Sequence, residues 1–285
     1  EDGSEGSFSN DIIVTPKARN VLLGSVSISV GDFTSFLIKD DGSLFSWGYS
    51  DGFGSVYGTS GDVWGEPAPI VYESGELFLS VDSVHSSGSY SVAVKTDGTL
   101  FHWGWFNDVK YYFPVSITDI SGQPIDNIKS IKVNYFNSFA ITQDSTLLMW
   151  GCADIWWPMW SECPNFIENP RVVTDFQGHA LTGIENIYTI SHSNGFSHFA
   201  VKGGKLFKLE QDMGGNIILV PVIDYDGSPI VNIKAITSVL SEGYGIDGGD
   251  VDIVILKADG RVEVLTEVNY IDYEYDMTNL KMQVK

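Results

Sequence analysis

The chain of 285 residues carries 37 acidic side chains against 16 basic ones, which gives a formal net charge of −21. Nucleic-acid binding needs basic stripes that neutralise phosphates, so this composition argues against a nucleic-acid partner and equally against an anionic membrane surface. No apolar segment approaches the roughly 20 residues that a membrane-spanning helix requires, so we expect no membrane span.

Residues 1–10 are rich in Gly, Ser and acidic side chains, a composition typical of a flexible tail. Residues 11–285 are enough to bury an ample core, and we expect them to form one domain. No stretch of this domain shows sustained helical periodicity. The sequence therefore predicts an all-β domain that follows a flexible acidic tail.

One phrase recurs along the domain: a tight turn, then a β-favouring run that ends in Trp-Gly. Three full copies occupy 41–48, 97–104 and 144–151 and read DGSLFSWG, DGTLFHWG and DSTLLMWG, while eroded copies occupy 203–209 and 259–265. The last apolar residues of the copies lie 56, 47, 59 and 56 residues apart, at Trp47, Trp103, Trp150, Leu209 and Leu265. A period of about 50 residues indicates units that are stacked or arranged radially.

Each copy has the pattern of a β-hairpin. An apolar run precedes the turn, and the Asp-Gly and Gly-Gly pairs favour type I′ turns, which need a positive φ at both central residues. The predicted hairpins are centred near residues 42, 98, 145, 204 and 260. Both faces of their strands are largely apolar, as expected for sheets that are sandwiched between neighbours.

Further strands complete each unit. Apolar strands precede three of the hairpins, at 127–131, 186–190 and 232–236. Additional turns precede those strands, at 119–125, 175–178 and 224–230. About four strands per unit is typical of the blade of a β-propeller, so we expect a single propeller with five visible blades. The side chains expected to be mostly buried between blades are Phe45, Trp47, Phe101, Trp103, Leu148 and Trp150.

The repeat resembles that of the regulator-of-chromosome-condensation (RCC1-like) family over roughly residues 25–285. Segments 31–38 and 134–141 match the family pattern Gly-x-x-His-Ser-Leu-Ala-Leu, and the Asp-Gly and Leu-x-x-Trp-Gly elements follow it. The family's His is replaced here by Thr34, Tyr90, Asn137 and Ser197. A network built on that His is therefore lost or replaced.

The resemblance also implies an architecture and a function. Propellers of this family usually have seven blades, and Asn279, Leu280 and Lys281 resemble the first strand of a sixth unit. Either a ring of five blades closes with terminal segments, or the chain is a piece of a longer propeller. The family's function implies guanine-nucleotide exchange on a Ran-type small GTPase. Its chromatin binding is not carried over, because the chain is strongly acidic.

Catalytic patterns are weak in this sequence. It has no Gly-x-Ser-x-Gly elbow, His-Glu-x-x-His helix or Gly-Lys-Ser/Thr phosphate loop, so we expect neither an enzyme nor a cofactor. We interpret the five histidines as structural or surface residues: His85, His102, His179, His192 and His198. Asp247, Asp250 and Asp252 could hold calcium, although their spacing departs from the twelve-residue loop and a solvated loop is the alternative.

The loops that follow Trp-Gly are unusually aromatic. The second-unit loop and the third-unit loop supply the candidate partner-binding residues: Trp105, Phe106, Tyr111, Tyr112, Trp156, Trp157, Met159 and Trp160. The first-unit loop holds Phe53, Tyr57 and Trp64. Loops at equivalent positions of a repeat emerge on one face, where exposed aromatic clusters mark recognition surfaces. The alternative is that these side chains fold inward and pack on one another.

The two cysteines, Cys152 and Cys163, bracket the third-unit loop. A disulfide between them would persist in an oxidising compartment, which favours a secreted or surface-exposed protein. Two reduced, buried thiols are the alternative.

Three functions fit these observations. The first is a non-enzymatic module that binds a protein partner through its aromatic loop face. The second is the exchange factor for a Ran-type GTPase, and the third is a glycan-binding surface, because sugar rings stack on tryptophan. An exchange factor of this family uses a polar β-wedge, and no Asp-Asn-Asn-Gly-like segment stands in a blade loop here.

Overall fold

The computed structural model describes 24–31, 34–48, 66–87, 90–106, 109–134, 136–152, 163, 165–192, 195–212, 216–224, 226–240 and 251–267. Within these residues the chain forms nineteen β-strands and no helix, so it has none that could cross a membrane. The predicted tail at 1–10 and the sixth-unit strand at Asn279, Leu280 and Lys281 lie outside the described residues.

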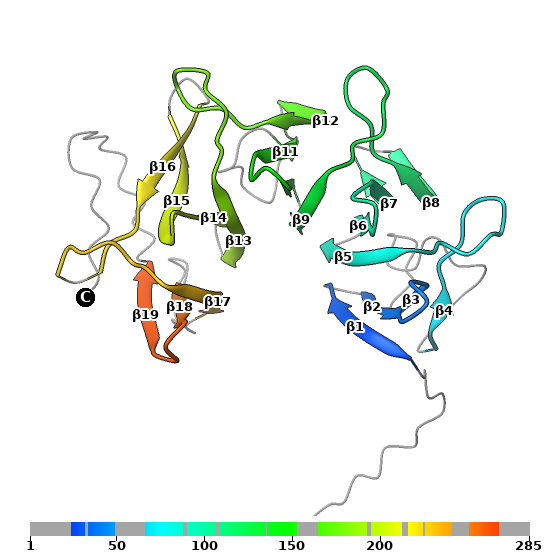
Figure 1. Cartoon of the computed structure of the whole chain (residues 1–285), viewed down its shortest axis with the longest axis horizontal. Helices are drawn as coiled ribbons and strands as arrows, with labels where there is room; N and C mark the ends of the chain where they lie inside the picture. The colour runs from blue at the N-terminus through cyan, green and yellow to red at the C-terminus, as the bar shows by residue number, and fades with distance from the viewer. Residues whose placement is uncertain are drawn as a thin grey trace, which may run out of the picture.

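The strands form five antiparallel sheets, which we number in chain order (Figure 1). The first sheet contains β1 (Ser25–Val30), β2 (Thr34–Lys39), β3 (Leu44–Gly48) and β4 (Ala68–Pro69). The second contains β5 (Val81–Ser87), β6 (Tyr90–Lys95), β7 (Leu100–Phe106) and β8 (Val109–Ser116). The third contains β9 (Ile128–Val133), β10 (Asn137–Thr142), β11 (Leu147–Cys152) and β12 (Phe166–Val172).

The fourth and fifth sheets follow the same order. The fourth contains β13 (Ile184–His192), β14 (Gly195–Lys202), β15 (Lys205–Gln211) and β16 (Ile217–Pro221), and the fifth contains β17 (Ile233–Leu240), β18 (Val251–Lys257) and β19 (Val262–Glu267). Each sheet is a meander in which neighbouring strands are consecutive in the chain. Figure 1 shows the sheets around a centre, with the first strand of each innermost. The predicted five-bladed, all-β propeller arrangement is confirmed.

The central hairpins turn where the sequence predicts, but the turn type differs in four of the five. At the first turn the Gly42 N–H donates to the Lys39 carbonyl (2.9 Å) and Lys39 N–H donates to the Ser43 carbonyl (3.0 Å). Gly42 has φ 75°, whereas Asp40 and Asp41 are not among the residues with positive φ. This is a type I turn closed by a left-handed residue, and Gly98, Ser145 and Gly260 hold the same place. The type I′ expectation holds at the fourth hairpin, where Gly203 and Gly204 both have positive φ.

Three of the described outer turns that lead from one sheet to the next are capped by aspartates. Asp119 Oδ1 accepts hydrogen bonds from the backbone N–H groups of Ser121 (2.8 Å) and Gln123 (3.0 Å). Asp175 and Asp224 make the corresponding bonds in the later units. This geometry explains the turn signature at 119–125, 175–178 and 224–230, because Asp readily bonds the backbone two residues on.

The hydrophobic core lies between successive sheets. Between the first and second, Phe36, Ile38 and Leu44 pack against Val84 and Trp103. Trp103 and Trp150 are fully buried and Leu148 is buried, as predicted, whereas Phe45, Trp47 and Phe101 are only half-buried. Phe45 and Trp47 face away from the second sheet, so that sheet does not cover them. Phe101 lies at the border of its cluster, under the ammonium of Lys95 (5.3 Å from the ring centroid).

Candidate binding site

The second-unit loop predicted to bind a partner is a β-hairpin extension formed by the ends of β7 and β8. Gly104 pairs with Tyr111, Trp105 with Lys110, and Phe106 with Val109. Because side chains alternate across a strand, Phe106 and Tyr111 share one side of the hairpin and line a cavity, while Trp105 and Tyr112 remain exposed. The hairpin therefore presents aromatic residues on both sides.

The inward side chains line a cavity of about 320 Å³ between the second and third sheets. Its walls are Tyr90, His102, Phe106, Tyr111, Val115, Ser116, Ile117, Thr118, Trp150, Glu168 and Asn169. The lining combines aromatic rings with polar side chains, so the cavity offers both stacking surfaces and hydrogen-bonding groups. The sheets come together here because Tyr90, Val92 and Trp150 share one hydrophobic cluster.

Aromatic rings surround the imidazole of His102 on several sides. Its centroid lies 4.5 Å from that of Tyr111 and 5.6 Å from those of Tyr90 and Phe106. Burial lowers the pKa of His102 from its usual value to about 4, because desolvation penalises the imidazolium. At neutral pH this wall of the cavity is therefore uncharged.

A short hydrogen-bond chain holds the floor of the cavity in place. Trp150 Nε1 donates to the Tyr90 hydroxyl oxygen across 3.1 Å, which links the third sheet to the second. The same hydroxyl lies 3.2 Å from His102 Nδ1. Burial raises the pKa of Tyr90, so the hydroxyl keeps its proton. Tyr90 stands where the resembling family has His. The hydrogen bonds of its hydroxyl to Trp150 and His102 form a different network at that position.

The outward side chains of the hairpin form an exposed aromatic pair that already holds a cation. Trp105 is 41% exposed and Tyr112 is 57% exposed. The Lys110 ammonium lies 5.7 Å from the Trp105 ring centroid and 5.2 Å from that of Tyr112. These rings therefore accept a positive charge in a cation–π geometry.

The rim of the cavity is acidic on the side of β12. Glu168 is exposed there, and the neighbouring Asn169 side chain donates to the Thr118 carbonyl (3.0 Å). A carboxylate beside ring faces suits a basic or hydroxyl-rich group, because both carboxylates and π faces attract positive charge.

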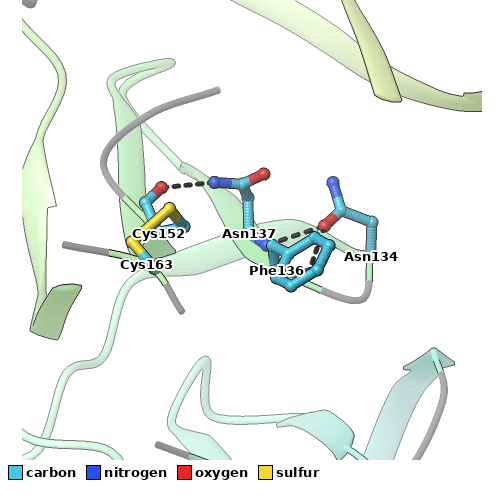
Figure 2. Close-up of a disulfide and its surroundings, with 5 residues drawn as sticks. All are labelled: Asn134, Phe136, Asn137, Cys152 and Cys163. Carbon is cyan, nitrogen blue, oxygen red and sulfur yellow. Dashed lines mark hydrogen bonds between the residues drawn. A yellow bond between two sulfur atoms is a disulfide. The ribbon is translucent and has the colours of Figure 1, made fainter. Parts of the chain in front are cut away.

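The third-unit loop begins at the end of β11, next to this rim. Cys152 and Cys163 are joined by a disulfide with Cα atoms 5.7 Å apart, as predicted (Figure 2). The predicted binding residues Trp156, Trp157, Met159 and Trp160 lie outside the described residues, as do Phe53, Tyr57 and Trp64 of the first-unit loop. The structure therefore places half of the predicted site.

The start of the disulfide loop is fixed by hydrogen bonds from two asparagine side chains and the backbone. Asn134 Oδ1 accepts the N–H groups of Phe136 (2.8 Å) and Asn137 (2.7 Å), and the Asn137 side chain donates to the Cys152 carbonyl (Figure 2). Cys152 N–H in turn donates to the Phe136 carbonyl (2.8 Å). Gly151 makes this approach possible, since it has φ 96° and an added Cβ would lie 2.2 Å from that carbonyl oxygen. The glycine of Trp-Gly is therefore needed at the end of the strand, where the backbone of Phe136 approaches too closely for a side chain.

The sequence pattern identified Phe106 and Tyr111 but not the other walls of the cavity. Tyr90, His102 and Trp150 looked structural because they lie in repeat strands, and Glu168 carried no motif. One feature of the sequence could have pointed to Tyr90, because it replaces the His that the RCC1-like family has at this position. The sequence left open whether the loop aromatics are exposed or fold inward. In this hairpin both occur, because the inward rings pack against neighbouring rings and the outward rings are exposed.

A metal site finds no support in the described part of the chain, where no three His, Cys, Asp or Glu side chains are grouped to hold an ion. Asp247 and Asp250, expected as possible calcium ligands, lie outside that part, and Asp252 is described only as a residue of β18.

Comparisons with known proteins agree with the repeat. Residues 26–55 match the family described as the regulator of chromosome condensation (RCC1) repeat. Protein RCC1 of Candida albicans is 24% identical over 205 residues, which are 65% of this chain and 42% of that protein. The E3 ubiquitin-protein ligase HERC2 of Homo sapiens is 23% identical over 177 residues, 60% of this chain and 4% of that protein.

Two solved structures show the same fold. Yeast RCC1 (Prp20), solved with Kap60, superposes with a TM-score of 0.58 at 16% identity, covering 92% of this chain and 61% of that one. Human WBSCR16 gives a TM-score of 0.56 at 12% identity, covering 85% and 61%. The chain is thus an RCC1-like repeat propeller in sequence resemblance and fold. It spans less than two thirds of the length of these relatives.

Proposed function

We propose that this RCC1-like propeller is a non-enzymatic binding module that recognises a protein partner through the second-unit hairpin and the adjoining cavity. The observation that supports this most is a single hairpin whose inward side chains line a cavity while its outward side carries exposed aromatic rings. Buried aromatic anchors surrounded by a polar rim are typical of energetically dominant interface regions. Trp105 and Tyr112 supply the exposed rings, and Phe106 and Tyr111 line the cavity.

The chemistry of the site favours a partner that presents a basic side chain. The Lys110 ammonium of the chain itself lies over the rings of Trp105 and Tyr112, which shows that these rings can bind a lysine side chain. Glu168 adds a carboxylate at the rim, and the neutral His102 adds no opposing charge. The net charge of −21 steers basic partners toward the protein as a whole.

We propose that Trp156, Trp157, Met159 and Trp160 extend the same surface. The support is the position of the loop's ends. Cys152 ends β11, and Phe166 begins β12 with its ring 5.0 Å from Phe106. A disulfide across the loop reduces the conformational entropy that binding must overcome.

The test is a selection of randomised linear peptides on the immobilised full chain, followed by affinity measurements on the enriched peptides. We expect enrichment of Lys or Arg beside an aromatic or aliphatic residue. The double variant Trp105→Ala/Tyr112→Ala should weaken these peptides at least about tenfold, and Glu168→Gln should weaken the basic ones selectively. Phe176→Ala is the matched control, because Phe176 is also an exposed aromatic residue but lies on an outer turn.

Peptides that bind all variants equally, while the thermal midpoints stay unchanged, would place the binding surface elsewhere. A selection that yields no peptide would count against peptide recognition by this site. Titration with oligosaccharides separates the glycan-binding alternative, which predicts loss of sugar binding in the same ring variants.

Guanine-nucleotide exchange on a Ran-type GTPase is the second candidate, favoured by the likeness to Protein RCC1. It makes a different prediction, namely accelerated release of a fluorescent GDP analogue from the GTPase when this protein is added. Acceleration that survives Trp105→Ala/Tyr112→Ala would favour nucleotide exchange through another surface over partner binding at the second-unit hairpin.

We also propose that the protein works in an oxidising compartment, as a secreted or surface-exposed protein. The support is the Cys152–Cys163 disulfide, since such bonds persist outside reducing compartments. Thiol labelling in freshly lysed source cells tests this proposal, which requires both cysteines to be protected from the label.

A further inference from the structure

Buried hydrogen bonds determine which ring nitrogen of His102 carries the proton. Trp150 Nε1 can only donate, so the Tyr90 hydroxyl oxygen accepts from it across 3.1 Å. The hydroxyl proton of Tyr90 then needs an acceptor, and His102 Nδ1 at 3.2 Å is the one that the described residues offer. Nδ1 is therefore the unprotonated nitrogen, and the neutral imidazole carries its proton on Nε2.

The Nε2–H group of His102 is available to a ligand in the cavity between the second and third sheets. His102 forms part of the cavity wall and is 8% exposed. Its Nε2 makes no hydrogen bond among the described residues, yet it is not one of the enclosed side-chain atoms that lack a partner. The atom is thus accessible, and the cavity is the opening that the His102 side chain lines. The second sheet therefore offers an uncharged hydrogen-bond donor of fixed position.

Asn169 supplies an acceptor whose orientation is fixed in the same way. Its Nδ2 donates to the Thr118 carbonyl across 3.0 Å, and a carbonyl can only accept, so this bond determines which end of the amide is which. Oδ1 is then the atom left for a ligand, and the half-buried Asn169 side chain lines the same cavity. The third sheet therefore adds an acceptor to the donor of the second.

Both sheets interrupt their regular strand pairing beside this cavity. In the second sheet the register shifts after His102, and in the third it shifts after Met149. The shift in the third sheet lies opposite Glu168 and Asn169, and these two consecutive residues both line the cavity. The corresponding strands of the fourth sheet pair without a shift. Bulges of this kind redirect side chains and are frequent beside functional sites.

We propose that the cavity binds the side-chain carboxamide of a glutamine or asparagine of the partner protein. The inference rests on the proposed function and names the group that enters the cavity. A carboxamide has an acceptor for His102 Nε2–H and a donor for Asn169 Oδ1. Its planar face packs on aromatic rings, and Phe106 and Tyr111 line the same cavity. A carboxylate would be repelled by Glu168, and an ammonium group has no acceptor for the His102 proton.

Nitrogen-15 NMR of the full chain with labelled histidine tests the proposal, with butyramide as a probe that mimics the glutamine side chain. The chain alone should show His102 as the Nε2–H tautomer, and butyramide should shift its Nε2 signal until the site saturates. His179 is the internal control, because it is exposed on an outer turn beside Asp175 and should not respond. Butyrate, butylamine and butanol should bind at least about fivefold more weakly, since each lacks the separate acceptor and donor of the amide.

Two histidine variants separate the donor from the fold. His102→Phe keeps a ring and removes the donor, so butyramide should bind roughly fivefold more weakly in saturation-transfer NMR, which observes the probe. His179→Phe is the matched control and should bind like the wild type. Tyr90→Phe should leave His102 in a mixture of tautomers, because Nδ1 then loses its donor. Thermal midpoints show whether each variant folds, and the tautomer and probe measurements on the wild type decide the matter even if one does not.

An Nδ1–H tautomer in the wild type, no response to butyramide, or butanol that binds as tightly as butyramide overturns the proposal. These results would leave partner binding at the second-unit hairpin standing if basic peptides are still selected and still depend on Trp105 and Tyr112. A saturable butyramide shift together with a failed peptide selection would instead support the cavity site and count against recognition through the hairpin.

Discussion

Replacing Trp103 with alanine measures how far the propeller depends on packing between its sheets. The indole is completely buried between the first and second sheets, in edge-to-face contact with Phe36 (6.1 Å between centroids) and Phe78 (6.0 Å). Truncation of a buried Trp typically costs about 3–5 kcal/mol in free energy of unfolding. Trp103 Nε1 is buried without a hydrogen-bond partner among the described residues, so no polar bond is lost and we expect the lower end, about 3 kcal/mol.

The equivalent Trp150 makes the comparison sharper. Its Nε1 donates to the Tyr90 hydroxyl, which Trp150→Ala would leave buried with one partner fewer. We therefore expect Trp150→Ala to cost about 5 kcal/mol, since an underbonded buried hydroxyl adds to the cavity term. Trp105→Ala, two residues from Trp103 on the same strand, should cost no more than about 1 kcal/mol because its side chain is substantially exposed.

Urea unfolding followed by circular dichroism measures all three variants under non-reducing conditions. The order of destabilisation should be Trp150, then Trp103, then Trp105. Equal losses at Trp103 and Trp105 would refute the reasoning, because these residues differ in burial and not in chemistry. A smaller loss at Trp150 than at Trp103 would refute the role given to the Tyr90 hydrogen bond.

Three further predictions concern the disulfide, the pH and a strained glycine. Reduction of the Cys152–Cys163 bond should lower the free energy of unfolding by about 3 kcal/mol, and thiol titration before reduction should find no free thiol. The folded pKa of His102 is lowered from 6.5 to about 4, so between these values the unfolded chain binds the extra proton. The stability that neutral His102 contributes should therefore be present above pH 6.5 and fall by up to about 3 kcal/mol as the pH drops toward 4, and His102→Gln should remove that part of the slope in urea titrations. Gly151→Ala should cost at least about 2 kcal/mol, because its Cβ meets a backbone oxygen, whereas Gly178→Ala, with positive φ and open space, should cost about 1 kcal/mol in the same assay.

Much of the fold could be predicted because its signals are local and repeated. The apolar runs on either side of Gly42 define a hairpin within ten residues, and five such signals confirm one another. The turn type could not be predicted from the sequence, because Asp-Gly is compatible both with a type I′ turn and with a type I turn closed by a left-handed glycine. The hydrogen bond from the Gly42 amide to the Lys39 carbonyl distinguishes them, and it depends on the strand register.

The site was harder to predict because its walls come from different units. Phe106 and Tyr111 were identifiable from an aromatic loop, but Tyr90 and Trp150 are 60 residues apart in the chain. Their contact exists only because consecutive sheets stack face to face. The sequence pattern could not predict exposure either. Trp103 and Trp105 are two residues apart, a spacing that places both side chains on one side of a regular strand, yet Trp103 is buried and Trp105, beyond the register shift at Gly104, is exposed.

The cavity forms where the repeat departs from itself. The place of Tyr90 is taken by Thr34, Asn137 and Ser197 in the first, third and fourth sheets, and the place of His102 by Ser46, Met149 and Lys208. Those alternatives are smaller, apolar or charged, so the pair of a tyrosine hydroxyl and a neutral imidazole occurs once among these repeat positions. The repeated residues maintain the packing between sheets that every unit needs. A different residue in one unit is compatible with that packing if its buried polar group has a hydrogen-bond partner. Tyr90 does so through Trp150, a residue conserved in kind across the first three units as the repeat's tryptophan. Departures from the repeat that are buried and hydrogen-bonded are therefore the positions at which this propeller acquires chemistry of its own.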